Sequence, residues 1–218
     1  MLGRSLVPLH PLHKAVLLCL VLAPFCAARA SSHDWDYQES HSDSRDFAPG
    51  GTLHVRLSVG DLNIRRGDSN KIALHYTVKS RHERNVKEAH VDFDVHGNDA
   101  SIEFHATSHS NTSFDVELEI PANTNLDVHA KVGDLTVEDI EGDKDLELGV
   151  GDVRVVRGNA DYRLVQASSG IGDVSGDVRG NERGEVSGWL GKTLKYHGDG
   201  KYELRAHVGV GDITLERK

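Results

Sequence analysis

The stretch Leu126–Val137 reads LDVHAKVGDLTV and contains the pattern that decides the fold. Apolar residues occupy every second position up to 132, which is typical of a β-strand with one buried face. The pair Gly133-Asp134 then shifts the alternation by one residue, so the chain must bend there for both runs to face one core. Glycine suits such a corner because it adopts positive φ and allows close backbone approach.

The same pattern occurs five times, which indicates a repeat fold. The aspartates at the five predicted corners are Asp61, Asp134, Asp152, Asp173 and Asp212. The last four are separated by 18, 21 and 39 residues, and 39 is close to two periods. A degenerate turn at residues 185–190 would fill this gap and give about five coils of 18–21 residues between residues 122 and 218.

We therefore predict an all-β protein in which residues 122–218 form a short parallel β-solenoid. Residues 45–121 contain strand-like runs separated by turn signals, and they predict a small N-terminal β-sheet subdomain. Residues 31–44 are rich in Ser, His and Asp and predict a flexible lead.

Residues 1–30 have the features of a secretory signal peptide. Arg4 and Lys14 are basic, residues 15–27 form an apolar run of 13, and residues 28–30 give a small-x-small cleavage motif. The apolar run is too short for a membrane-spanning helix, which needs about 20 residues. We expect an exported protein, periplasmic or extracellular, with no membrane span after signal cleavage.

The composition excludes several classes of function. Removing the leader leaves 22 basic and 34 acidic residues, a net charge of −12, so nucleic-acid binding is not expected. Both cysteines, Cys19 and Cys26, lie in the leader, so the mature chain has no thiol chemistry and no disulfide scaffold. Aromatic residues are 6% of the chain, which argues against an aromatic-lined ligand pocket, and no motif predicts a cofactor.

Four features together point to a family. They are the leader, the strand GGTLHVRL at Gly50–Leu57, the segment LEIPANTNLDV at Leu118–Val128, and the repeated Gly-Asp-(Leu/Val/Ile) corners. In these features the chain resembles the bacterial putative-adhesin family of exported β-strand-repeat domains of unknown function, over roughly Phe47 to Leu215. The resemblance implies a non-catalytic, adhesin-like interaction domain whose partner is an envelope protein or a glycan, and it supplies no catalytic residues.

The corner aspartates should stack in one column, where carboxylates about 4.8 Å apart repel one another. One hypothesis is a row of calcium ions, which prefer oxygen ligands. The other is that each aspartate caps backbone N–H groups of its own turn. The repeat lacks the Gly-Gly-x-Gly-x-Asp nonapeptide of calcium-binding β-rolls, which favours the capping hypothesis.

The segment HVDFDVH at residues 90–96 predicts a candidate metal site. Its alternation places His90, Asp92, Asp94 and His96 together on the face opposite the apolar residues. Imidazole and carboxylate groups two residues apart on a strand can share Zn²⁺, Cu²⁺ or Ni²⁺, so a periplasmic metal-binding protein is an alternative function. The same pattern also fits the solvated outer face of a one-sided sheet.

A carbohydrate-active enzyme is a further alternative, because long β-helices often carry polysaccharide-cleaving sites. Its candidate residues are Asp152, Asp173, Asp177 and Arg179, since glycoside chemistry requires paired acids. A solenoid this short offers little room for a long substrate groove, so we predict that the protein is not an enzyme.

The last predicted strand ends almost at the end of the sequence. An unpaired strand edge there would need a cap or a partner. We therefore predict possible self-association through the edge at Val208–Leu215.

Overall fold

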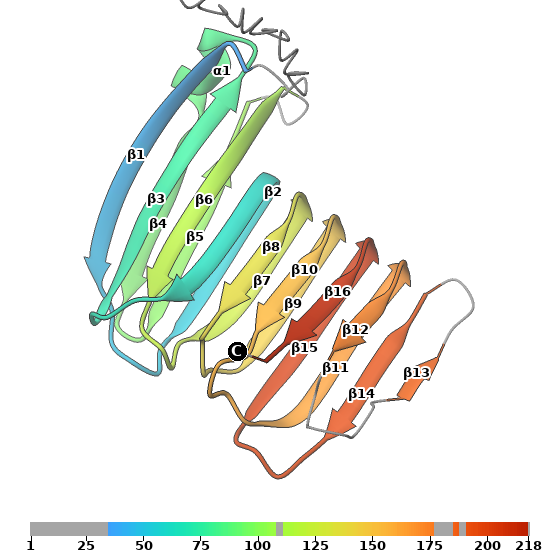
Figure 1. Cartoon of the computed structure of the whole chain (residues 1–218). Helices are drawn as coiled ribbons and strands as arrows, with labels where there is room; N and C mark the ends of the chain where they lie inside the picture. The colour runs from blue at the N-terminus through green and yellow to red at the C-terminus, as the bar shows by residue number, and fades with distance from the viewer. Residues whose placement is uncertain (1–34, 108–110, 177–184, 188–190, 218) are drawn as a thin grey trace, which may run out of the picture. The chain divides into compact units, whose positions relative to one another are not determined.

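The computed structural model describes residues 35–107, 111–176, 185–187 and 191–217 (Figure 1). Within these ranges the protein is all-β apart from one short helix, as the sequence predicts. The predicted leader at residues 1–30 lies outside the described residues. The elements in chain order are β1 Tyr37–Asp46, β2 Thr52–Arg66, β3 Lys71–Ser80, α1 Glu83–Glu88, β4 His90–His96, β5 Asp99–His105, β6 Thr112–Ile120, β7 Asn125–Val132, β8 Leu135–Glu138, β9 Lys144–Val150, β10 Val153–Val156, β11 Tyr162–Ile171, β12 Val174–Gly176, β13 Glu185–Ser187, β14 Thr193–His197, β15 Tyr202–Val210 and β16 Ile213–Glu216.

The strands form two sheets that share the 15-residue strand β2. The strand order is β12-β16-β10-β8-β2-β6-β3-β1 in sheet A and β13-β14-β11-β15-β9-β7-β2-β5-β4 in sheet B. Residues 52–59 of β2 pair within sheet B, and residues 60–66 pair within sheet A. Pairing is parallel wherever two Gly-Asp repeats meet, and it becomes antiparallel only toward the ends of the sheets.

The inward-facing side chains of the two sheets meet in one hydrophobic cluster. Because the parallel strands are in register, equivalent positions stack in columns. One column contains Leu53, Leu126, Lys144, Leu204 and Val165. Burying an aliphatic side chain of this size contributes about 1.5–3 kcal/mol relative to exposing it, so these columns are what hold neighbouring repeats together.

Each predicted Gly-Asp corner turns the chain from sheet B into sheet A. The five corner glycines have φ between +131° and +141°, a region that side chains other than glycine rarely adopt. A Cβ at any of them would also lie only 1.9–2.1 Å from a backbone oxygen of the neighbouring strand. The residue before the corner is pushed out of the core, so that four aliphatic side chains are 43–58% exposed: Val132, Val150, Val210 and Ile171.

The repeats do not stack in chain order, which corrects our prediction. Strand β15 lies between β9 and β11, and β16 lies between β10 and β12. The order in space is therefore Asp61, Asp134, Asp152, Asp212, Asp173. The described strands within the 39-residue gap do not form the expected parallel coil, because β13 pairs antiparallel with β14 and β14 pairs antiparallel with β11. Residues 188–190 of the expected turn lie outside the described residues.

The predicted free edge at Val208–Leu215 is therefore wrong. Both β15 and β16 are paired on both sides, because the last repeat inserts between two earlier ones. Among the described strands, the edges of sheet A are β12 and β1, and those of sheet B are β13 and β4.

Residues 37–44, expected to belong to a flexible lead, are part of strand β1. This strand pairs antiparallel with β3 over ten residues, and side-chain contacts such as Ser40 Oγ to Thr77 Oγ1 (2.9 Å) and the stacked rings of His41 and Tyr76 hold it there. Every residue of β1 is exposed. The strand therefore lacks the apolar alternation that would have marked it in the sequence.

No helix among the described residues is long and apolar enough to cross a membrane.

Candidate functional site

The corner aspartates form a hydrogen-bonded ladder across the repeats. The backbone N–H of Asp134 donates to Asp61 Oδ1 (3.0 Å), and that of Asp152 donates to Asp134 Oδ1 (3.0 Å). The series continues with Asp212 donating to Asp152 (2.8 Å) and Asp173 to Asp212 (2.7 Å). Capping is thus confirmed for four of the five carboxylates, with the correction that each of the four caps the turn of the next repeat instead of its own.

The far end of this ladder is closed by a cation. No further repeat follows Asp173 in the ladder among the described residues, and its carboxylate forms an ion pair with Lys192. The N–H donors and this lysine offset the repulsion between neighbouring carboxylates. The aspartates therefore have a structural role at the corners.

The four residues named for glycoside chemistry are not brought together among the described residues. Asp152 and Asp173 are separated by Asp212, which lies between them in the ladder. Asp177 and Arg179 lie outside the described residues.

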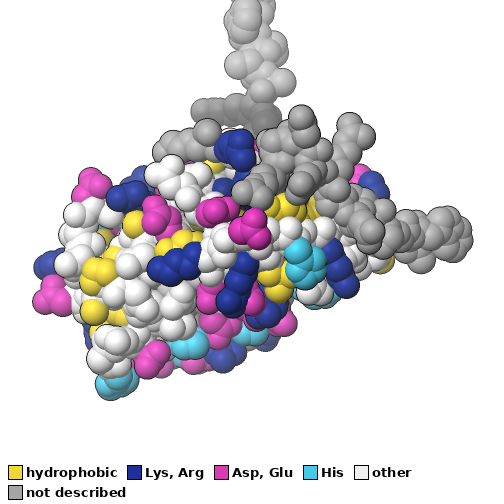
Figure 2. Space-filling view, turned by 90° about the horizontal axis from the view of Figure 1, so that it is seen from below, with side chains coloured by type: hydrophobic (Ala, Val, Ile, Leu, Met, Phe, Trp, Pro, Cys, Tyr) yellow, Lys and Arg dark blue, Asp and Glu magenta, His cyan; other side chains and the backbone are white. Residues whose placement is uncertain are grey.

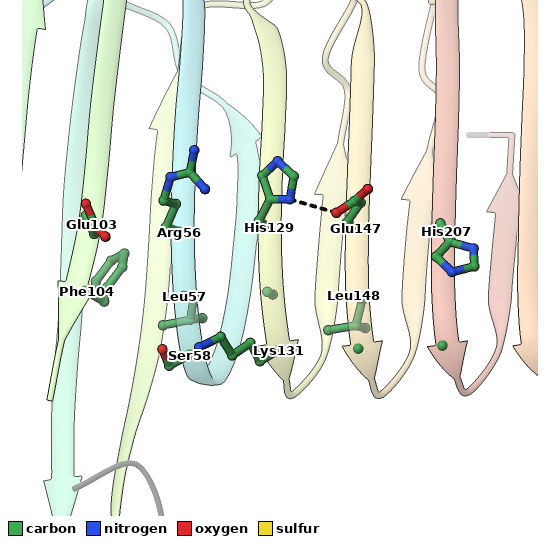
Figure 3. Close-up of a pocket in the computed structure, with 13 residues that line it drawn as sticks. Arg56, Leu57, Ser58, Glu103, Phe104, His129, Lys131, Glu147, Leu148 and His207 are labelled. Atoms are coloured by element: carbon green, nitrogen blue, oxygen red, sulfur yellow. Dashed lines mark hydrogen bonds and ion pairs between the residues drawn. The ribbon is translucent and has the colours of Figure 1, made fainter.

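The outer face of sheet B carries a groove of about 580 Å³ that crosses β5, β2, β7, β9 and β15 (Figure 3). Its floor includes Gly149 and Gly209, which have no side chains and lie against neighbouring backbone. A Cβ at either position would be 2.5 Å from a carbonyl oxygen of the adjacent strand. The sequence signal for this hollow is a second glycine two residues before the corner glycine, which gives Gly-x-Gly-Asp at 149–152 and 209–212.

One rim of the groove is a row of polar side chains that in-register pairing brings together. Arg56, His129, Glu147 and His207 occupy equivalent positions on β2, β7, β9 and β15 (Figure 3). Lys131 and Ser58 lie on the other side of the floor, nearer the corners. The groove therefore offers hydrogen-bond donors and acceptors, including basic and acidic side chains, around a floor of apolar side chains and backbone atoms.

Histidines and carboxylates alternate in a chain beside this rim. His54 Nδ1 lies 2.7 Å from Asp127 Oδ2, and Asp127 Oδ1 lies 2.9 Å from His129 Nε2. His129 Nδ1 in turn lies 2.9 Å from Glu147 Oε2. The contact from His129 Nδ1 is a hydrogen bond, which the carboxylate of Glu147 accepts. We did not predict this cluster, because it depends on the register between strands that are far apart in the sequence.

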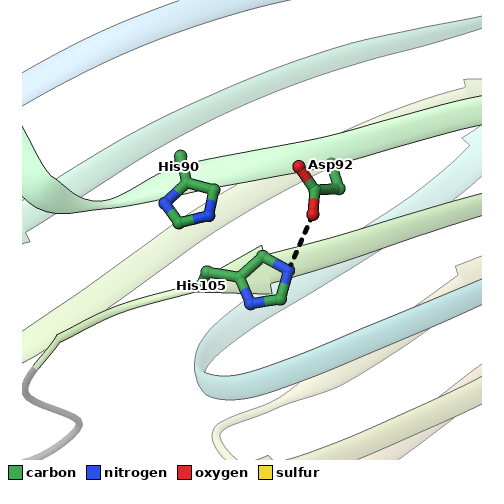
Figure 4. Close-up of side chains that lie close together, drawn as sticks. All are labelled: His90, Asp92 and His105. Carbon is green, nitrogen blue, oxygen red and sulfur yellow. Dashed lines mark ion pairs between the residues drawn. The ribbon is translucent and has the colours of Figure 1, made fainter.

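The four predicted metal ligands all lie on the exposed face of β4, as the alternation predicts. Two of them, His90 and Asp92, belong to a group of three potential ligands among the described residues, and the third member, His105, comes from the neighbouring strand β5. Ligand atoms of His90, Asp92 and His105 lie within 4.8 Å of one another (Figure 4). Asp94 and His96 are not part of this group, because the antiparallel pairing sets them opposite Ser101 and Asp99, away from His105.

The core column described above contains one charged residue. Lys144 is 3% exposed, and its Nζ donates to the carbonyl oxygen of Gly142 (2.8 Å) and lies 5.1 Å from the ring centroid of Tyr162. Burial lowers the pKa of Lys144 to about 7, although Asp143 and Glu141 partly oppose the shift. Lys144 also borders a surface pocket of about 260 Å³, but its amine is held by Gly142 and Tyr162, so we assign it a structural role in the core.

Acidic, basic and histidine side chains are interspersed over the face seen in Figure 2, with apolar side chains reaching the surface between them. A surface of this kind has no single-sign field of the sort that binds nucleic acids.

No protein-family model and no curated protein matches the chain. Among solved structures, a putative cell adhesion protein from Clostridium sporogenes is 16% identical, covers 83% of this chain and 100% of its own, and has a TM-score of 0.47. A putative adhesin from Bacteroides fragilis is 9% identical, covers 81% of this chain and 97% of its own, and has a TM-score of 0.34. A putative adhesin from Parabacteroides merdae is 12% identical, covers 84% of this chain and 97% of its own, and has a TM-score of 0.28.

The chain thus resembles solved proteins named as adhesins, in agreement with the family resemblance of its sequence. Because these TM-scores lie below 0.5, we take neither the fold nor the function from them.

Proposed function

We propose that the chain is an exported, non-catalytic β-repeat domain of the adhesin-like kind, which acts by binding an envelope protein or a glycan. In this proposal the stacked Gly-Asp repeats are a short β-solenoid that serves as a rigid support. The in-register parallel pairing of five repeats, held by buried columns and by the aspartate ladder, supports this part of the proposal.

The observation that carries the proposal is the groove on the outer face of sheet B. It crosses five strands instead of lying between loops, and its glycine floor lets a partner approach the backbone closely. Extended partners suit the repetitive faces of stacked repeats. The mixed rim of Arg56, Glu147 and His207 supplies donors and acceptors that would orient such a partner.

Site-specific cross-linking in the native host tests this proposal. We would place a photoactivatable amino acid at His207, which is exposed in the groove, and at Asn63, which is exposed on the outer face of sheet A. We expect an envelope component to be captured from position 207 and not from position 63. Equal capture from both positions, or none from either, would contradict binding through the groove.

A second measurement separates binding from catalysis. A binding domain should release its captured partner unchanged, so the partner eluted from purified protein should have the same mass before and after incubation. Cleavage of the partner that is lost in a folded Glu147→Gln variant would show an enzyme instead.

A further inference from the structure

The chemistry of the group on β4 and β5 goes beyond partner binding. Strands β4 and β5 pair antiparallel, which sets His90 opposite His105 and Asp92 opposite Glu103. His90 and Asp92 are two residues apart on one face of β4, the edge strand of sheet B. Two imidazoles and one carboxylate therefore converge from two strands that a short turn at residues 97–98 connects.

The geometry of this group fits a transition metal. A tetrahedral zinc ion holds N and O ligands at about 2.0–2.1 Å, which sets two ligand atoms about 3.3 Å apart. Asp92 Oδ2 and His105 Nε2 are 3.2 Å apart, and all three ligand atoms lie within 4.8 Å of one another (Figure 4). The ring of His90 stacks on that of His105, with centroids 4.8 Å apart, so binding one ion requires the exposed His90 side chain to rotate about its own bonds.

The hydrogen bonding leaves the right nitrogens free. His90 Nδ1 lies 3.3 Å from the carbonyl oxygen of Glu88, and a carbonyl only accepts, so Nδ1 is the donor and, in the neutral imidazole, Nε2 has the lone pair that can bind a metal. Metal-binding histidines commonly donate their second N–H to a carbonyl in this way. His105 Nε2 is buried and, despite its distance to Asp92, has no hydrogen bond.

Space for further ligands adjoins the group. A cavity of about 390 Å³ is lined by His90, His105, Glu88 and Glu103, so a carboxylate or a water molecule can complete the coordination. This cavity shares Ser58, Glu103 and Phe104 with the groove on sheet B. A metal held there would sit at the end of the proposed binding face.

We propose that His90, Asp92 and His105 form a binding site for a divalent transition-metal ion, with zinc as the representative ion. Imidazole nitrogens favour Zn²⁺, Cu²⁺ and Ni²⁺ over the oxygen-seeking Ca²⁺ and Mg²⁺. The ligand set replaces Asp94 and His96 of the sequence prediction by His105.

Calorimetric titration of the purified chain with zinc chloride tests the proposal. We expect one saturable site, and we expect His90→Ala, Asp92→Asn and His105→Ala each to weaken zinc binding at least tenfold. The matched controls are Asp94→Asn and His96→Ala, on the same face of β4, and His129→Ala, in the histidine–carboxylate chain. These three should bind as the unchanged chain does, and calcium should not compete.

A second readout guards against variants that fail to fold. Co²⁺ in place of zinc should give the intense visible absorption of a tetrahedral site, and this absorption should be absent in the three ligand variants. The melting temperatures of the metal-free variants should lie within a few degrees of that of the unchanged chain. Weak binding that is shared equally by all variants would identify scattered surface histidines and overturn the proposal. Loss of binding in the His129 or His96 variants would overturn it as well.

Discussion

At the residue scale, the corner glycines are required by two independent constraints. Gly151 has φ of +132°, and a Cβ there would lie 1.9 Å from the carbonyl oxygen of Gly133. Gly97 also has positive φ, +64°, but a Cβ there would meet nothing within 4 Å. Substituting Gly97 therefore tests backbone strain alone, whereas substituting Gly151 tests backbone strain together with a collision between repeats.

We predict that Gly151→Ala lowers the free energy of unfolding by about 3 kcal/mol or more, because strain and collision add. Gly97→Ala should cost only about 1–2 kcal/mol, which is the strain of a left-handed residue alone. Urea unfolding followed by circular dichroism compares the two. Equal losses would mean that the close approach at the corner relaxes without cost.

The buried Lys144 makes stability depend on pH. Its pKa falls from 10.5 in the unfolded chain to about 7 in the folded protein, because burial penalises the charged amine. Between pH 7 and pH 10 the unfolded chain holds a proton that the folded protein lacks, so stability rises with pH, by up to about 1.4 kcal/mol per unit. Below pH 7 both states are protonated, and the folded protein bears the full cost of burying the charge.

We predict that Lys144→Met is more stable than the unchanged protein at pH 7, and that this advantage shrinks as pH rises toward 10. The unbranched apolar side chain of methionine is similar in shape to the lysine stem and fits the column between Leu126 and Leu204. Urea unfolding at pH 7, 8, 9 and 10 measures the difference, and effects of the histidines cancel in it. Substitution of the exposed Lys195 by Met is the control and should show no such pH dependence. If the difference in unfolding free energy between Lys144→Met and the unchanged protein were the same at every pH, the burial argument would be wrong.

At the element scale, the aspartate ladder is what joins one corner to the next. Asp152 accepts the N–H of Asp212 and donates its own N–H to Asp134. We predict that Asp152→Ala costs about 1 kcal/mol, as the loss of a helix-capping side chain does. Asp152→Asn keeps an acceptor oxygen and removes a charge from the ladder, so it should be nearly neutral.

The exposed Asp145 on the outer face of β9 supplies the control for this pair. Asp145→Ala should leave the unfolding midpoint in urea unchanged. A loss as large as that of Asp152→Ala would show that the charge, and not the cap, stabilises the fold.

The elements themselves could be predicted because their signals are local. Alternation and the Gly-Asp pairs placed every corner, and the alternation of β4 placed His90 and Asp92 on one face. The strand β1 escaped prediction because backbone pairing with β3, and not an apolar face, holds it.

What the sequence could not predict depends on register between distant strands. His105 joins His90 only through the antiparallel pairing of β4 with β5, and the groove exists only because Gly149 and Gly209 fall side by side. The order of the repeats is a third case. All five repeats present nearly the same apolar pattern, so the pattern alone does not say which repeat packs on which.

At the scale of the whole molecule, the last repeat is the partner of two others. Strands β15 and β16 fill the position between the Asp152 and Asp173 repeats. We predict that deleting residues 201–218 abolishes cooperative unfolding of β9 to β14, because buried columns on both sides lose their neighbour.

Deleting residues 35–46 is the matched control, since it removes an edge strand whose residues are all exposed. Urea unfolding and limited proteolysis compare the two truncated chains. The C-terminal deletion should expose β11 to cleavage, and the N-terminal deletion should leave a protected body. A C-terminally shortened chain that unfolds like the full one would contradict the prediction.

The inserted repeat also fixes the order of events as the chain is made. In a repeat protein built strictly in sequence, each newly synthesised unit can pack on its predecessor at once. Here the unit containing Asp173 leaves the ribosome before its parallel neighbour, and among the described strands only the antiparallel β14 can pair with it before residues 202–216 arrive. Folding therefore cannot finish unit by unit behind the growing chain, because residues 202–216 close the stack between two repeats that precede them in the sequence.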